Sequence, residues 1–105
     1  MMNGETLWNQ VVSELSVSAK EVQTTRGFWF KASSHDGKIV VNAAADHEPR
    51  SKLSMPRTIS KKEFLSVYFY YEQWQSGEPG IRQVICKKSR NSAYILALIQ
   101  KALNG

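Results

Sequence analysis

Residues 26–42 have the sequence RGFWFKASSHDGKIVVN, and this stretch decides the fold. Its centre contains Asp36-Gly37, a pair that favours a two-residue turn between antiparallel strands. The three residues at positions 39–41 are all β-branched, which is typical of a strand. The sequence therefore predicts a hairpin over 26–42, and the hairpin predicts a small antiparallel sheet.

The first strand of this hairpin alternates between two kinds of side chain. Phe28, Phe30 and Ala32 fall on one face, which we expect to be buried. Trp29 and Lys31 fall on the other face. An outward tryptophan beside a lysine can stack on a nucleic-acid base or on a partner side chain, unless a helix or a loop covers it.

Three further stretches show the periodicity of amphipathic helices. The first extends from an Asn3 cap to about residue 16, where serines weaken it. The second covers 60–75 and begins at Ser60, whose hydroxyl can form a capping box with Glu63. The third covers 92–103.

Two shorter segments complete the prediction. A third strand is expected over 81–86, and a short strand over 57–59 would shorten the loop that follows the hairpin. We therefore predict one domain over residues 1–105. Its fold class is α+β, with a small antiparallel sheet packed against about three helices in the order α-β-β-α-β-α.

The composition bounds the location of the protein. Hydrophobic residues make up 42% of the chain, and no apolar run reaches the roughly 18 residues that a membrane span needs. The N-terminus lacks the basic and apolar regions of a secretory signal. Cys86 is the single cysteine, and we expect it to be a small apolar strand residue. These features predict a cytoplasmic protein without a membrane or a disulfide.

Catalytic and metal-binding motifs are missing from the sequence. There is no nucleophile elbow, phosphate-binding loop or dinucleotide fingerprint. The densest group of donor side chains is Asp46-His47-Glu48, whose adjacent residues cannot all face one ion in an extended loop. We therefore expect no enzyme activity, no metal and no cofactor.

Charge is segregated along the chain. Residues 1–48 carry a net charge of −2 and residues 49–105 a net charge of +7, which together give +5. Two basic loops precede the second and the last predicted helix. The first contains Arg50, Lys52, Arg57, Lys61 and Lys62, and the second contains Arg82, Lys87, Lys88 and Arg90. If the fold brings the loops together, they can bind a phosphate backbone; if not, they are ordinary solvating charge.

The second predicted helix is apolar over more than one face. Leu65, Phe69 and Tyr70 lie outside its main core stripe. They are covered either by other helices of the chain or by a second subunit, and in the latter case the protein is a homodimer.

A resemblance to a known class of proteins rests on three segments. They are the hairpin entry from Thr24 or Thr25 to Phe28, the helix start Ile59-Ser60 with Phe64, and the Asn91-Ser92-x-Tyr94-Ile95-x-x-Leu98 start of the last helix. In this order the chain resembles small accessory domains of bacterial restriction and mobile-element proteins. The resemblance implies a bacterial or phage-type source and DNA association, and it implies no catalytic residues.

The function predicted from the sequence is a non-enzymatic module that binds nucleic acid by contacting phosphates. Its alternative is a protein-interaction domain, such as an inhibitor, an immunity protein or an assembly factor, that uses the aromatic helix surface. Salt dependence separates the two, since phosphate contacts release counterions and weaken steeply as salt rises.

Overall fold

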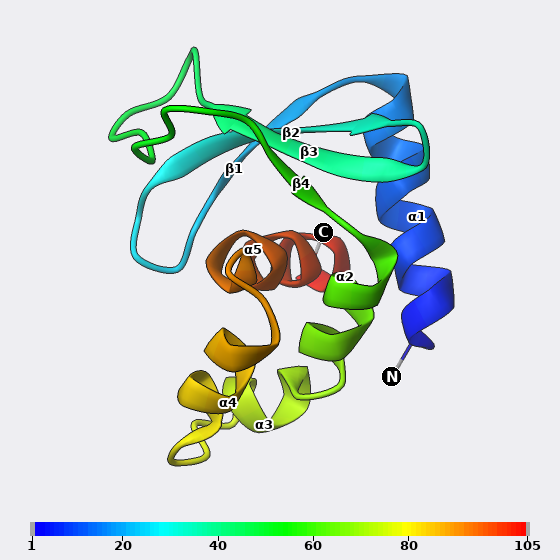
Figure 1. Ribbon diagram of the computed structural model, residues 1–105, viewed down its shortest axis with the longest axis vertical. Helices are drawn as coiled ribbons and strands as arrows, with labels where there is room; N and C mark the ends of the chain where they lie inside the picture. The colour runs from blue at the N-terminus through cyan, green and yellow to red at the C-terminus, as the bar shows by residue number, and fades with distance from the viewer. Residues whose placement is uncertain (1, 105) are drawn as a thin grey trace.

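An antiparallel sheet forms one layer of the molecule, and helices cover one face of it (Figure 1). The computed structural model describes residues 2–104. Within this range the sheet has four strands in the order β1-β2-β3-β4: β1 Lys20–Gln23, β2 Trp29–His35, β3 Lys38–Ala43 and β4 Arg57–Ile59. The predicted α+β class is therefore confirmed.

The hairpin predicted over 26–42 is confirmed as β2 and β3, which pair from Phe30↔Ala43 to His35↔Lys38. Its turn is made by Asp36 and Gly37, with φ angles of 52° and 73°. Both angles lie in the left-handed region, where glycine and aspartate are among the residues with the lowest cost. The turn chemistry therefore fixes the register of the pair.

The two outer strands extend the sheet beyond the hairpin. The first helix, α1 Gly4–Val17, ends at an extended Ser18, and the chain then enters β1, which pairs with β2. The predicted strand over 57–59 is confirmed as β4, which pairs with β3. The register pairs Val22 with Phe30, Ala32 with Val41, and Ile39 with Ile59. All six side chains are buried.

The helical layer packs on this buried face. Its main members are α1, α2 Lys61–Tyr68 and α5 Ser92–Asn104. The Asn3 cap and the Ser60–Glu63 capping box are both confirmed. Gly4 lets α1 approach α2 closely, since a Cβ at this position would lie 2.9 Å from a methyl carbon of Leu65. This approach places the first turn of α1 beside Leu65 and Tyr68 of α2.

The helix predicted over 60–75 is interrupted. It divides into α2 and a second helix, α3 Tyr71–Gln75, because the chain tightens at Tyr70, whose amide donates to the Val67 carbonyl three residues back. Residues 67–71 are a β-branched residue followed by aromatic residues, all of which lose side-chain freedom in a helix. The break leaves the Phe69 side chain 77% exposed.

The third strand predicted over 81–86 is wrong, because this segment belongs to α4 Ile81–Lys88. Ile81 and Ile85 are buried and Val84 is half-buried, which is the i, i+3, i+4 spacing of a helix face. Cys86 is therefore an exposed helix residue and not an apolar strand residue. In Figure 1, α3 and α4 lie beyond α2 and α5, away from the sheet.

The prediction that Phe28 is buried on the inner face of the hairpin is also wrong. It shares the parity of Phe30, but β2 begins only at Trp29, and Phe28 lies outside the sheet with 43% of its surface exposed. The alternation is correct for Phe30 and Ala32, which are both fully buried.

Candidate nucleic-acid interface

Basic and aromatic side chains from three distant segments line one groove of about 520 Å³. The segments are the β1–β2 turn, the loop that leads into β4, and the start of α5. We call this feature the Arg57 groove. It is lined by Thr24, Arg26, Phe28, Ser51, Lys52, Arg57, Arg90, Ala93 and Tyr94.

The β1–β2 turn holds Arg26 and Phe28 in place. The Thr24 amide donates to the Phe28 carbonyl at 2.8 Å, and the Phe28 amide donates to the Thr24 hydroxyl at 3.1 Å. Gly27 has a φ of +94°, a conformation that side-chain-bearing residues rarely adopt. The turn is therefore closed by hydrogen bonds within the turn itself, and Phe28 remains available at the surface.

The loop leading into β4 is bound to the first residue of β2. The Trp29 amide donates to the Pro49 carbonyl and the Ser51 amide donates to the Trp29 carbonyl, both at 2.8 Å. These two bonds extend the sheet by one parallel bridge. They place Ser51 and Lys52 next to the turn that presents Phe28.

Arg57 connects this side of the groove to the start of α5. Its guanidinium Nη1 donates to the Arg90 carbonyl at 3.3 Å, and its guanidinium carbon Cζ lies 5.9 Å from the centre of the Tyr94 ring. Tyr94 in turn packs edge-on against the buried Phe30, with ring centres 5.0 Å apart. The far wall of the groove is thereby anchored in the core.

Glu63 holds the loop that carries Arg90. Its carboxylate accepts hydrogen bonds from the Ser60 amide at 2.9 Å, the Ser89 hydroxyl at 3.0 Å and the Asn91 side-chain amide at 3.5 Å. Ser89 and Asn91 are buried, although both are polar. The capping box of α2 therefore also positions the start of α5, which the sequence did not indicate.

The groove is strongly positive. Its lining contains four cations, Arg26, Lys52, Arg57 and Arg90, and no acidic residue. Across residues 2–104, none of these four forms an ion pair with a carboxylate. Their charges remain available to an anionic ligand.

The structure divides the residues of the two predicted basic loops between two sites. Lys52, Arg57 and Arg90 meet in the Arg57 groove, while Lys61, Lys62 and Lys88 line a separate hollow. The others line neither: Arg50 pairs with Glu48, Arg82 donates to the Ser92 hydroxyl, and Lys87 is exposed at the end of α4.

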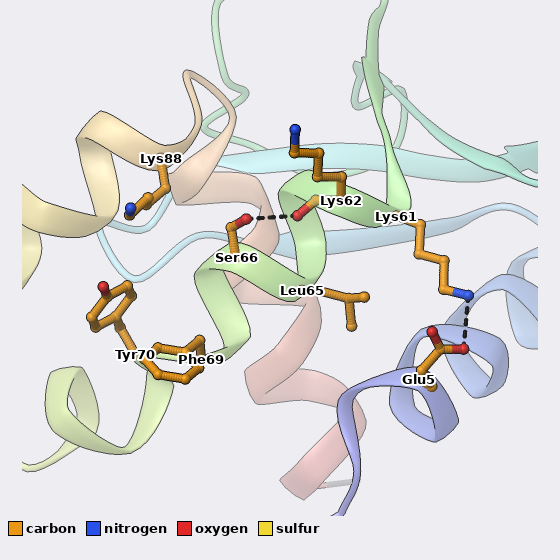
Figure 2. Close-up of a pocket in the computed structure, with 8 residues that line it drawn as sticks. All are labelled: Glu5, Lys61, Lys62, Leu65, Ser66, Phe69, Tyr70 and Lys88. Carbon is orange, nitrogen blue, oxygen red and sulfur yellow. Dashed lines mark hydrogen bonds and ion pairs between the residues drawn. The ribbon is translucent and has the colours of Figure 1, made fainter.

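The separate hollow lies between the start of α1, the outer face of α2 and the end of α4, and has a volume of about 720 Å³ (Figure 2). We call it the amphipathic hollow. It is lined by Glu5, Lys61, Lys62, Leu65, Ser66, Phe69, Tyr70 and Lys88. All three residues predicted to form an interface, Leu65, Phe69 and Tyr70, are therefore brought together here.

Trp29 is not free on the outer face of the sheet. The His47 ring covers it in a stacked arrangement, with ring centres 3.9 Å apart and planes inclined by 16°. A loop therefore covers Trp29, which was the alternative left open by the sequence. Lys31 is exposed on the same strand.

Glu21 fixes the loop that carries His47. Its carboxylate accepts hydrogen bonds from the amides of Ala45, Asp46 and His47 and contacts the His47 Nδ1 at 2.8 Å. Burial raises the pKa of this carboxyl, but the hydrogen bonds from residues 45–47 outweigh burial and lower its pKa to about 2. We call this arrangement the Glu21 clasp.

The sequence missed Arg26, Phe28 and Tyr94 as members of the groove. Arg26 is a single cation outside the basic runs, Phe28 was assigned to the buried face of the hairpin, and Tyr94 was noted only as part of the start of the last helix. A signal was present at Gly27, since a glycine directly before a strand often marks a turn that exposes its neighbours.

Comparisons of the chain with protein-family models, with curated proteins and with solved structures find no match. Within residues 2–104, no three His, Cys, Asp or Glu side chains are grouped so that they could hold a metal ion. No helix in the same range is sufficiently long and apolar to cross a membrane.

Proposed function

We propose that the protein binds nucleic acid through the Arg57 groove, without catalysis, and that it favours single strands. The observation that carries this proposal is the lining of the groove, where four cations without carboxylate partners surround two aromatic rings. A groove that follows a phosphate backbone and offers aromatic faces to bases is how proteins bind single strands without sequence preference.

Each wall has a separate role in this proposal. Arg57 and Arg90 contact successive phosphates, with Lys52 and Arg26 on the opposite side. Phe28, which is 43% exposed, stacks on an unpaired base. A duplex offers phosphates but no free base face, so it gains only the electrostatic part of the binding energy.

The test is a fluorescence-anisotropy titration with a labelled single strand and a labelled duplex, each at several salt concentrations. Four phosphate contacts on a single strand give a slope of log affinity against log salt of roughly −3. Arg90→Gln flattens this slope by about 0.7. Phe28→Ala weakens single-strand binding by about 1–3 kcal/mol and leaves the slope unchanged, because it removes stacking and no charge.

Lys38→Ala is the matched control. Lys38 is an exposed lysine beside the hairpin turn, and the length of β2, roughly 20 Å, separates it from Phe28. Lys38→Ala therefore removes one positive charge, as Arg90→Gln does, but at a site outside the groove. Absence of binding to both ligands at about 50 mM salt contradicts the proposal, as does an effect of Lys38→Ala equal to that of Arg90→Gln.

A further inference from the structure

The amphipathic hollow combines an apolar floor with a ring of lysines. Leu65, Phe69 and Tyr70 form the floor, and Phe69 and Tyr70 pack edge to face with ring centres 5.0 Å apart. Figure 2 shows the two rings together at the end of α2, below Lys88 and Ser66. With 77% of its surface exposed, Phe69 is an apolar side chain that the fold itself leaves uncovered.

The charges around this floor differ in their availability. Lys61 Nζ lies 2.7 Å from the Glu5 carboxylate and is neutralised by it. Lys62 and Lys88 form no ion pair within residues 2–104, and Lys88 Nζ lies 6.0 Å from the centre of the Tyr70 ring. Two free cations therefore lie beside an aromatic pair in which Phe69 is exposed and Tyr70 is half-buried.

We propose that the amphipathic hollow is a docking site for an acidic segment of another protein, with an apolar side chain seated on Phe69 and carboxylates on Lys62 and Lys88. Helices that dock in a groove combine an apolar anchor with charges complementary to the rim in this way. This site shares no lining residue with the Arg57 groove, so the proposal stands independently of nucleic-acid binding.

Charge complementarity separates this occupant from two others. A symmetric contact between two copies through this face brings Lys62 and Lys88 of both copies into one interface, where their like charges repel. A nucleic acid contacts proteins mainly through its phosphates, and these make no use of the aliphatic side chain of Leu65. An acidic peptide with a large apolar residue can use Leu65 and Phe69 as well as the two free lysines.

The test is selection of peptides from a random displayed library on the full chain, followed by anisotropy titration of the most enriched labelled peptide. We expect enriched peptides to carry Asp or Glu around a large apolar residue. Phe69→Glu should weaken binding of the selected peptide roughly tenfold or more. The double variant Lys62→Glu with Lys88→Glu should weaken it roughly tenfold, and replacing the acidic residues of the peptide by lysine should restore binding to that variant.

Val17→Glu is the matched control, since Val17 is an apolar residue of α1 that is 86% exposed and receives the same new charge. Val17 lies about 18 Å along α1 from Glu5, which is at the rim of the hollow. Retained peptide affinity in this variant, with loss in Phe69→Glu, supports the proposal. Circular dichroism of each variant tests whether the fold is retained.

Four results overturn the proposal. The first is that no peptides are enriched, or that those enriched carry no net negative charge. The second is peptide binding that is insensitive to Phe69→Glu. The third is a dimer in sedimentation velocity that Phe69→Glu dissociates, which assigns the face to a second copy. The fourth is a loss of single-strand affinity in Lys62→Gln or Lys88→Gln equal to or greater than that in Arg90→Gln. Each of these variants removes the same single charge, so this result would assign the hollow to the nucleic-acid surface.

Discussion

Truncation of Glu63 tests whether one carboxylate joins the start of α2 to the start of α5. Glu63→Ala removes the acceptor of two short hydrogen bonds, from the Ser60 amide at 2.9 Å and the Ser89 hydroxyl at 3.0 Å. The contacts with the Ser60 hydroxyl at 3.2 Å and with Asn91 at 3.5 Å are long for their donors and are counted as zero. The side chain is only partly buried, so the lower end of the range for bonds to a charged group applies.

At about 1.5 kcal/mol for each of the two bonds, Glu63→Ala lowers the free energy of unfolding by about 3 kcal/mol. For a domain of this length, a loss of 1 kcal/mol lowers the Tm by roughly 4–5 °C, so the expected decrease is about 12–15 °C. Glu63→Gln keeps one acceptor oxygen and should lose about half as much. Urea denaturation and thermal melting followed by circular dichroism measure both variants.

Glu14→Ala is the control, because Glu14 is an exposed carboxylate of α1 whose side chain has no hydrogen bond to a described residue. Its change should stay within about 0.5 kcal/mol. A double-mutant cycle then isolates the Ser89 contact: Ser89→Ala should cost much less in the Glu63→Ala background than in the natural chain. A loss below about 1 kcal/mol for Glu63→Ala, or full additivity in the cycle, would refute the role assigned to this carboxylate.

Three further outcomes follow from other contacts. Because the folded-state pKa of Glu21 is lowered to about 2 from an ordinary value of 4.5, its stabilising contribution is present above about pH 4.5 and is lost as the pH falls toward 2. Glu21→Gln should flatten this acid dependence of the urea midpoint, and a pKa of Glu21 near the ordinary value in an NMR titration would contradict the prediction. Tyr71→Phe should leave stability unchanged or raise it, since the buried Tyr71 hydroxyl has no hydrogen-bond partner within residues 2–104. Tyr68→Phe should cost about 0.5–1.5 kcal/mol of stability, because the Tyr68 hydroxyl donates to the Met2 carbonyl, and equal losses in the two variants would count against this difference. Ser60→Ala should cost about 0.5–2 kcal/mol through the loss of its cap, and an unchanged denaturation midpoint would exclude the capping box as a source of stability.

The parts of the fold that were predictable depend on neighbours in sequence. The Asp36-Gly37 turn and the Ser60–Glu63 capping box are local chemistry, and both were correct. The segment 81–86 was assigned to a strand although its apolar residues have helical spacing, because a run of six residues is short for distinguishing the two periods. The strand β1 was missed because Val22 also fits the periodicity of the preceding helix.

The candidate site was predictable only as a list of charges. Which lysines and arginines meet depends on pairings between distant segments, such as Arg57 with Arg90 and Trp29 with Ser51. These contacts join residues that are 33 and 22 positions apart in the chain, and no local pattern encodes them. The result is two basic surfaces in place of the single patch that the sequence left open.

The stacking of His47 on Trp29 gives the molecule a built-in optical probe. The three tryptophans lie in different settings: Trp8 is buried against Phe64 in the helical layer, Trp74 is half-buried beside Tyr71, and Trp29 lies beneath an imidazole ring. If the loop opens at the Glu21 clasp, the His47 imidazole moves away from the Trp29 indole, and the fluorescence emission of Trp29 alone changes. Variants that retain a single tryptophan can therefore follow the helical layer, α3 and the clasp one at a time, without an added dye.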